Sequence, residues 1–176
     1  MKRALLMLCG ILMTVTFQSC QQKTESFPKN IKELLKNVEI TIEIDETKEN
    51  AILRIPNENY AEIEYTSPAS PLFGYKEIVD GDKMKTEFQN ILWESKEVTT
   101  PLCRLLKKLR KIEDVINPKN KENHDNKQII YHFQSAEEEF TLCYDKKEEK
   151  PISLLYQYKT TKIKLDFHFQ ILTEET

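Results

Sequence analysis

The sequence predicts an α+β fold in which an antiparallel sheet curls into an unclosed half-barrel, with an N-terminal helix and one inserted amphipathic helix covering the concave face. Segments such as 38–44 and 162–171 alternate apolar and polar residues, which is typical of strands with one buried face. The pair Asp80-Gly81 is typical of a tight hairpin turn, which joins antiparallel neighbours. An apolar stripe at helical spacing between Pro101 and Ile116 predicts the covering helix.

The first elements are a short helix and three strands. Residues 28–36 are expected to be helical, because apolar residues recur there at helical spacing and Pro28 suits a first turn. The pattern then changes to strict alternation, and the predicted strands are 38–44, 51–55 and 60–66. Pro56 and Pro68 are expected to end the second and third of these strands, since proline cannot donate to a strand ladder.

A hairpin is predicted next. Strands at 75–79 and 83–93 flank Asp80-Gly81, a pair that suits the two positive φ angles of a type I′ turn. The next helix is expected to begin with Thr100 as N-cap and Pro101 as its first residue. Its apolar stripe comprises Leu102, Leu105, Leu106, Leu109, Ile112, Val115 and Ile116. The basic residues Arg104, Lys107, Lys108, Arg110 and Lys111 are predicted to lie off this stripe.

The last third of the chain returns to strands. A polar loop is predicted at 117–126, and strands follow at 128–134, 139–145, 151–158 and 162–171, which makes about nine strands in all. The long helix before them has a second interpretation, because a basic face opposite an apolar stripe also suits a helix lying on a membrane surface. Because the apolar face of a large sheet must be buried, we favour a helix that packs against the sheet.

An export signal precedes the predicted domain. Lys2 and Arg3 are followed by an apolar run over 4–17 and then by Ser19-Cys20, a small residue before a cysteine as at a lipidation site. Residues 17–22 lack the pair of small residues that ordinary signal cleavage needs. A plain cysteine near a cleavage site is the remaining alternative. We therefore expect a signal peptide at 1–19, a tether lipidated on Cys20 at 20–27, a half-barrel domain at 28–172 and a tail at 173–176.

Composition excludes several classes of function. The chain has 176 residues, with 26 basic and 29 acidic side chains, so it lacks the basic surface expected of a nucleic-acid-binding protein. It has three glycines, Gly10, Gly74 and Gly81, which is too few for a glycine-rich phosphate loop or a dinucleotide fingerprint. No cofactor is therefore predicted.

The order of these elements resembles the LolA/LolB-like lipoprotein-carrier superfamily, and in particular its lipid-anchored relatives of unassigned function in Gram-positive bacteria. The specific marks are Pro68 after the third strand, Gly74 and the turn at Asp80-Gly81. The likeness covers residues 31–171. It implies an unclosed antiparallel barrel whose apolar concave face shelters acyl chains in the carrier members.

The chain also departs from the carriers. It carries a predicted lipid of its own, whereas the soluble shuttle of that superfamily does not, and it has one inserted helix where carriers have several lid segments. Arg54 lies on an early strand, as does a lid-latching arginine in carriers. We expect Arg54 to be an outward-pointing surface residue.

The reactive side chains do not form a recognisable catalytic or metal motif. His124 lies in the polar loop, His132 in a strand, and His168 on the same polar face as Asp166, without the spacing of a zinc site. Cys103 and Cys143 are expected to be thiols packed as small hydrophobes, and a disulfide between them, outside the cytoplasm, is the alternative. We predict no metal site and no enzymatic activity, although distant groups can converge on an active site in ways that sequence does not reveal.

The expected function is that of a lipoprotein on the extracytoplasmic face of a bacterial cell membrane. It would contact the membrane through its N-terminal lipid, bind no nucleic acid, and use the half-barrel to hold a lipid or other apolar ligand. The alternative is a structural or protein-interaction lipoprotein whose barrel is filled by its own side chains. A cavity of roughly 300 to 1,000 Å³ under the inserted helix favours ligand binding, and a solid interior favours interaction.

Lipidation is tested by the substitution Cys20→Ala. The variant should lose acyl labelling completely, because no thioether can form without the cysteine sulfur. Metabolic labelling with a radioactive fatty acid, followed by immunoprecipitation, measures this. Labelling of the variant at the wild-type level would contradict the lipoprotein assignment, and Ser19→Ala, which keeps a small residue before the cysteine, is the control that should stay labelled.

Overall fold

The computed structural model describes residues 31–97, 100–115, 121–123 and 127–169. The first part of the chain forms α2 (Ile31–Leu34), β1 (Val38–Ile44), β2 (Thr47–Asn57), β3 (Tyr60–Tyr65), β4 (Lys76–Asp80), β5 (Lys83–Phe88) and β6 (Ile91–Ser95). Two helices follow, α3 (Pro101–Arg110) and α4 (Ile112–Val115). The last part forms β7 (Lys121–Asn123), β8 (Gln128–Gln134), β9 (Glu138–Asp145), β10 (Lys150–Tyr158) and β11 (Thr161–His168).

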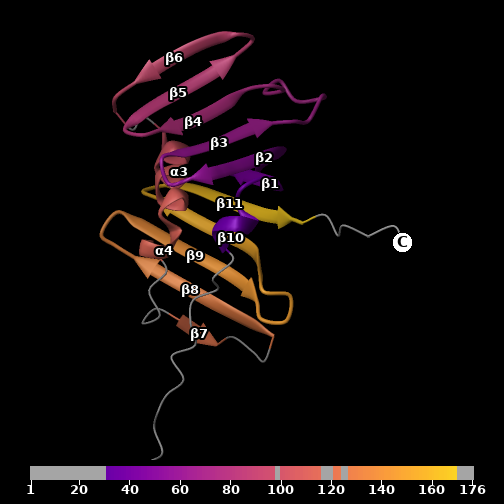
Figure 1. Cartoon of the computed structure of the whole chain (residues 1–176), viewed down its shortest axis with the longest axis vertical. Coiled ribbons are helices and arrows are strands. Elements are labelled where there is room, and N and C mark those ends of the chain that lie inside the picture. The colour runs from indigo at the N-terminus through magenta and orange to yellow at the C-terminus, as the bar shows by residue number, and fades with distance from the viewer. Residues whose placement is uncertain (1–30, 98–99, 116–120, 124–126, 170–176) are drawn as a thin grey trace, which may run out of the picture.

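The described strands make one antiparallel sheet. Its order is β6-β5-β4-β3-β2-β1-β11-β10-β9-β8-β7, so two meanders meet where the first strand pairs with the last. Figure 1 shows β6 and β7 at opposite ends of the sheet, which is therefore not closed into a barrel. The unclosed antiparallel sheet predicted from the sequence is confirmed.

One face of the sheet, here called the inner face, carries the core. The strands alternate in burial as predicted: in β11, Ile163, Leu165 and Phe167 are buried and Lys164 is exposed. Pairing keeps these side chains together, because Leu165 lies opposite Ile42 on β1 and Leu154 on β10. The opposite, outer face carries most of the charged side chains of the strands.

The sheet has eleven strands in the described residues rather than about nine. The predicted strand 83–93 is in fact two strands, β5 and β6, joined by a two-residue turn. Gln89 and Asn90 take φ angles of 49° and 67° there, the backbone of a type I′ turn without a glycine. The other additional strand, β7, lies within the segment predicted to be a loop at 117–126 and pairs with β8.

The hairpin between β4 and β5 is present, but the predicted turn is wrong by one residue. Asp80 pairs with Lys83, so the central residues are Gly81 and Asp82. Gly81 has a φ of 58° and Asp82 is not among the residues with positive φ, which is the pattern of a type II′ turn rather than type I′. The Gly81 amide also donates to the Asn59 carbonyl at 2.7 Å and ties this turn to the turn after β2.

Pro56 does not end its strand, because β2 continues to Asn57. The pairing of β2 with β3 shifts between Arg54 and Asn57, so the proline lies where the ladder is interrupted. Pro151 in β10 lies at a similar register shift. A strand tolerates proline at a bulge, where no ladder hydrogen bond is lost.

The predicted helices are shorter than expected. Within the described residues, α2 covers only Ile31–Leu34 of the predicted 28–36. The predicted 101–116 helix is interrupted at Lys111, whose φ of −116° separates α3 from α4, and Ile116 lies outside the described residues. No helix in the described part of the chain is both long and apolar enough to span a membrane.

The turn at Gly81 yields a prediction about stability. Gly81→Val should destabilise the domain by about 1–3 kcal/mol, because a β-branched residue adopts a positive φ only under strain. Space is not limiting, since an added Cβ at Gly81 would meet no atom within 4 Å. Urea unfolding measures the change, and Gly81→Asn is the control that should keep most of the stability, because asparagine tolerates this conformation. Equal midpoints for wild type and Gly81→Val would contradict the assigned turn.

Candidate functional site

Helix α3 positions the candidate site. Thr100 is the N-cap, as predicted, and its hydroxyl oxygen accepts a hydrogen bond of 3.1 Å from the Cys103 amide. The apolar stripe packs against β2, β3 and β4, and Leu105 and Leu106 are 0% exposed. The stripe is therefore part of the protein core and does not form a membrane-surface helix.

The same helix also contacts the second meander. Lys108 forms an ion pair of 2.6 Å with Glu138 on β9, and the Arg104 guanidinium lies 4.4 Å from the centre of the Tyr158 ring on β10. Tyr156 donates to the Glu138 carboxylate at 3.0 Å, and its burial raises the pKa of the phenol. Basic side chains predicted to lie off the stripe thus join α3 to distant strands of the sheet.

A cleft of about 270 Å³ opens at the C-terminal end of α3. Its walls come from α2, from the end of β2 with the turn that follows, and from the junction of α3 with α4. Four buried apolar side chains line it: Leu35, Ile55, Leu109 and Ile112. The Ile55 amide donates to the Leu35 carbonyl at 3.0 Å, which holds the segment after α2 against β2. This cleft is the candidate site.

The charged residues at the rim of the cleft are paired with one another. The Lys32 Nζ atom lies 2.8 Å from a carboxylate oxygen of Glu58 and 2.9 Å from one of Glu113. The Lys36 Nζ atom lies 2.7 Å from a carboxylate oxygen of Glu33. The hydrogen bonds and charge of Lys32 hold the pKa of the Glu58 carboxyl below its usual range. The rim is polar, but its charges are compensated locally.

Arg110 is the exception among the cleft residues. It was predicted to lie off the apolar stripe, and its side chain is nevertheless buried, at 7% exposed. Arg110 follows Leu106 by four residues, so it lies one helical turn further along, on the flank of the apolar stripe. The spacing of the apolar residues alone did not reveal that a charged residue would be buried there. Its Nη1 atom donates to the Asn59 carbonyl at 2.6 Å, whereas its buried Nε has no hydrogen-bond partner.

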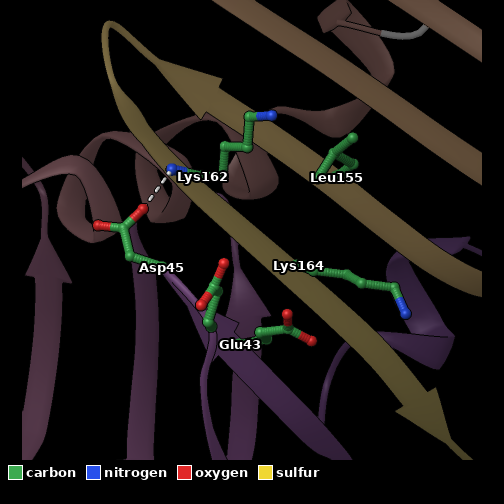
Figure 2. Close-up of a pocket in the computed structure, with 6 residues that line it drawn as sticks. Glu43, Asp45, Leu155, Lys162 and Lys164 are labelled. Carbon is green, nitrogen blue, oxygen red and sulfur yellow. Dashed lines mark hydrogen bonds between the residues drawn. The ribbon is translucent and has the colours of Figure 1, made fainter.

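A second hollow, of about 310 Å³, lies on the outer face, where β1 meets β11. Its lining is Glu43, Asp45, Glu46, Leu155, Lys162 and Lys164. Figure 2 shows Asp45 accepting a hydrogen bond from the Lys162 backbone amide, at 3.1 Å. Two of the other charges pair with neighbours, Glu43 with Lys48 and Lys164 with Asp166. The hollow is a surface of locally paired charges.

The predicted reactive residues do not converge. His132 contacts Thr141 at 2.9 Å on the outer face, and His168 contacts Thr41 at 2.8 Å rather than Asp166. His124 and Cys20 lie outside the described residues. Among the described residues, no group of histidine, cysteine, aspartate and glutamate is arranged to hold a metal ion.

Neither of the described cysteines, Cys103 and Cys143, forms a disulfide. Cys103 is buried and donates to the Glu77 carboxylate at 3.1 Å, and the Thr100 hydroxyl donates to the same oxygen at 2.8 Å. Burial, and then the charge of Glu77, raises the pKa of the Cys103 thiol to about 12. This thiol stays protonated at neutral pH and is no nucleophile.

Arg54 points to the outer face, as the sequence predicted. It is on β2 between the buried Leu53 and Ile55, and it forms ion pairs with Glu62 and Glu64 on β3. The short contact of the Tyr60 hydroxyl with Glu62 extends this network. Its described partners lie on the neighbouring strand, and none belongs to α3.

The edge strand β6 is the most apolar exposed segment in the described residues. Ile91, Leu92 and Trp93 are 55%, 56% and 51% exposed. Ile91 and Trp93 pair with Phe88 and Thr86 of β5 and share their inner face, while Leu92 projects from the outer face. Sequence alternation alone did not indicate that this segment folds back to the edge of the sheet.

The solved structures that resemble this chain include three bacterial proteins. Lipoprotein LppX from Mycobacterium tuberculosis is 12% identical with a TM-score of 0.40, and the match covers 77% of this chain and 86% of that chain. LprF from Mycobacterium bovis is 9% identical with a TM-score of 0.43, and the match covers 84% of this chain and 90% of that chain. A LolA superfamily protein from Nitrosomonas europaea is 9% identical with a TM-score of 0.38, and the match covers 80% of this chain and 89% of that chain. The superfamily that the order of elements resembles is thus represented among the structural neighbours. No protein-family model matches the chain, and no curated protein matches its sequence. With every TM-score below 0.5, these likenesses do not indicate what the chain binds.

The packing of α3 is tested by Leu105→Asp and Leu109→Asp. Each places a charge in a buried apolar site and should cost about 3–5 kcal/mol, a large share of the stability of a typical domain. Thermal melting measures this, and Lys107→Asp on the half-exposed face of the same helix is the control expected to cost less than about 1 kcal/mol. Melting temperatures for the leucine variants that equal that of the control would contradict the packed helix.

The pKa of Cys103 yields a prediction about alkylation. At pH 8 the folded protein should leave Cys103 unmodified by iodoacetamide, because the buried thiol with a pKa of about 12 is almost wholly protonated. Half-buried Cys143 should react faster, and both should react in urea. Peptide mass spectrometry gives both rates in one sample. Modification of Cys103 at the same rate with and without urea is the contrary result.

Proposed function

We propose that this chain is a bacterial envelope lipoprotein, held by lipid on Cys20 at the extracytoplasmic face of the cell membrane, that binds a lipid or another apolar ligand without catalysing a reaction. The observation that carries the proposal is the cleft at the end of α3, which is lined by Leu35, Ile55, Leu109 and Ile112 and is large enough for part of an acyl chain. Its volume, about 270 Å³, is just below the range of roughly 300 to 1,000 Å³ that is typical of ligand pockets, so it suits a small apolar ligand or part of a larger one.

We further propose that the sheet curves toward α3, so that this helix covers a concave face. Cys103 contacts Glu77 on β4, whereas Lys108 contacts Glu138 on β9, six strand positions away. In a flat sheet these strands would be about 29 Å apart, at about 4.8 Å per strand. Along a helix, two residues separated by five positions are only about 7.5 Å apart. A sheet curved around the helix accounts for both contacts.

The absence of catalysis is supported by how the described polar groups are used. The charged residues around the cleft pair with one another, and the carboxylate of Glu77 binds the Thr100 hydroxyl and the Cys103 thiol instead of facing the cleft. A catalytic site needs a nucleophile or base within reach of a bound substrate. The apolar side chains of the cleft supply neither, which suits binding rather than reaction.

A protein-interaction lipoprotein is the second candidate, and two observations favour it. The region directly under α3 is filled by its own side chains, since Leu105 and Leu106 are fully buried. The edge strand β6 presents Ile91, Leu92 and Trp93 to solvent, and an exposed apolar edge can pair with a strand of another protein.

Titration with a neutral apolar dye separates the two functions. The mature chain, residues 20–176, carries Cys20→Ser so that it needs no detergent. Wild-type domain should bind N-phenyl-1-naphthylamine, and Ile55→Phe, which enlarges a side chain at the mouth of the cleft, should weaken binding at least tenfold. Leu155→Phe on the outer face is the matched control and should bind as the wild type does.

The contrary outcome is equally specific. If Ile55→Phe leaves dye binding unchanged while Trp93→Ser abolishes it, the apolar ligand site is at β6 and the cleft is not the binding site. If the wild type binds no dye, the ligand-binding proposal fails and the interaction role is favoured.

A further inference from the structure

We propose that Arg110 makes the cleft selective for an anionic amphiphile, a molecule with one carboxylate or phosphate ester group attached to an apolar chain. The inference rests on the proposed ligand-binding function and specifies the chemistry of the ligand. The apolar lining would take the chain, and the guanidinium would bind the head group.

The position of Arg110 in the cleft is the first support. It is the last residue of α3, it lines the cleft beside Leu109, and it is 7% exposed. Arginine is rarely this buried unless it is paired with an anion or forms a full set of hydrogen bonds. Among the described residues, the guanidinium donates one hydrogen bond, to the neutral carbonyl of Asn59, and its buried Nε–H has no partner.

The local charge is the second support. Within the described residues, no carboxylate lies within ion-pair distance of Arg110, and Asp80 and Asp82 act on it only at longer range. Burial lowers the pKa of Arg110, although arginine remains protonated at neutral pH. A buried cation without a partner is costly, so an anion arriving from solution would be bound strongly. Guanidinium is well suited to this because its planar set of donors matches carboxylate and phosphate.

The rim explains why one negative charge suits the site better than several. Lys32 forms ion pairs with Glu58 and Glu113, and Lys36 forms one with Glu33. The positive charges of both lysines are therefore already paired with carboxylates of the protein. Neither lysine is therefore available to balance the further charges of a multiply charged head group. One buried cation behind a neutralised rim matches a single anionic group.

A purely structural role for Arg110 is the rival explanation. A cation in the last turn of a helix is favoured by the helix dipole, and the bond to Asn59 fastens α3 to the turn between β2 and β3. This role explains the hydrogen bond of Nη1, but it does not explain why the Nε–H is buried without a hydrogen-bond partner. The two explanations differ in what they predict for ligand charge.

The experiment compares octanoate with octan-1-ol, which have the same chain length but differ in charge. Isothermal titration calorimetry on residues 20–176 carrying Cys20→Ser should show octanoate binding at least tenfold more tightly than octanol. Arg110→Gln should lower octanoate affinity until the preference for octanoate over octanol is lost. Arg104→Gln, which removes an arginine that stacks on Tyr158 outside the cleft, is the matched control and should keep the preference.

A spectroscopic measurement on the unsubstituted cleft protects the test against a variant that fails to fold. The Nε–H resonance of Arg110 in an ¹⁵N-edited NMR spectrum should shift on addition of octanoate and stay in place with octanol. Acetate and inorganic phosphate, which lack the chain, should shift it only at concentrations at least tenfold higher than octanoate.

The outcomes are distinguishable. Equal affinities for octanoate and octanol would overturn the role of Arg110 while leaving the ligand-binding function intact. Binding of phosphate or acetate as tight as that of octanoate would show a site for a free anion and overturn the amphiphile assignment. If neither octanoate nor octanol binds, the proposed function itself fails, and the inference fails with it.

Discussion

The inner face of the sheet must be kept from water, and one ten-residue helix does much of this. The eleven strands of the described residues form a wide sheet with a long apolar surface on that face, and each buried leucine or isoleucine side chain contributes about 1.5–3 kcal/mol. Helix α3 covers β2, β3 and β4 with its leucine stripe. Lys108 and Arg104 extend its contacts to β9 and β10. The position of α3 therefore decides which parts of the inner face remain open.

Both candidate functional surfaces lie where this cover ends. At the C-terminal end of α3, the break at Lys111 turns the chain into α4, and the cleft opens between the two helices, α2 and the end of β2. Beyond β4, the inner face continues to β6, where Ile91 and Trp93 are exposed. A short helix on a wide sheet leaves apolar surface at its margins. Ligand binding and protein interaction are thus alternative uses of surface that the helix does not cover.

The sequence predicted the strands that alternate cleanly and missed the features that depend on tertiary position. Strands β1 and β8 have the predicted bounds, because alternation against a single core directly determines which residues face inward. The fold-back at Gln89 and Asn90 was missed because no glycine marks it, and β7 was missed because three polar residues carry no periodic signal. The burial of Arg110 was not predicted, since residue type alone does not show that the helix end meets the turn at Asn59. The cleft is formed by α2, the end of β2 and the junction of α3 with α4. These segments are far apart in the sequence, so no local pattern could have revealed the cleft.

The central claim is that α3 is an integral part of the core rather than a mobile lid, and native-state hydrogen exchange tests it most directly. If the leucine stripe is docked as described, the amides of Leu105, Leu106 and Leu109 should exchange only through global unfolding. Their opening free energies should then equal those of Ile42 in β1 and Leu165 in β11, and should fall in parallel as denaturant is added. Exchange of the α3 amides through a separate opening of lower free energy, while β1 and β11 stay protected, would show a lid and contradict the account.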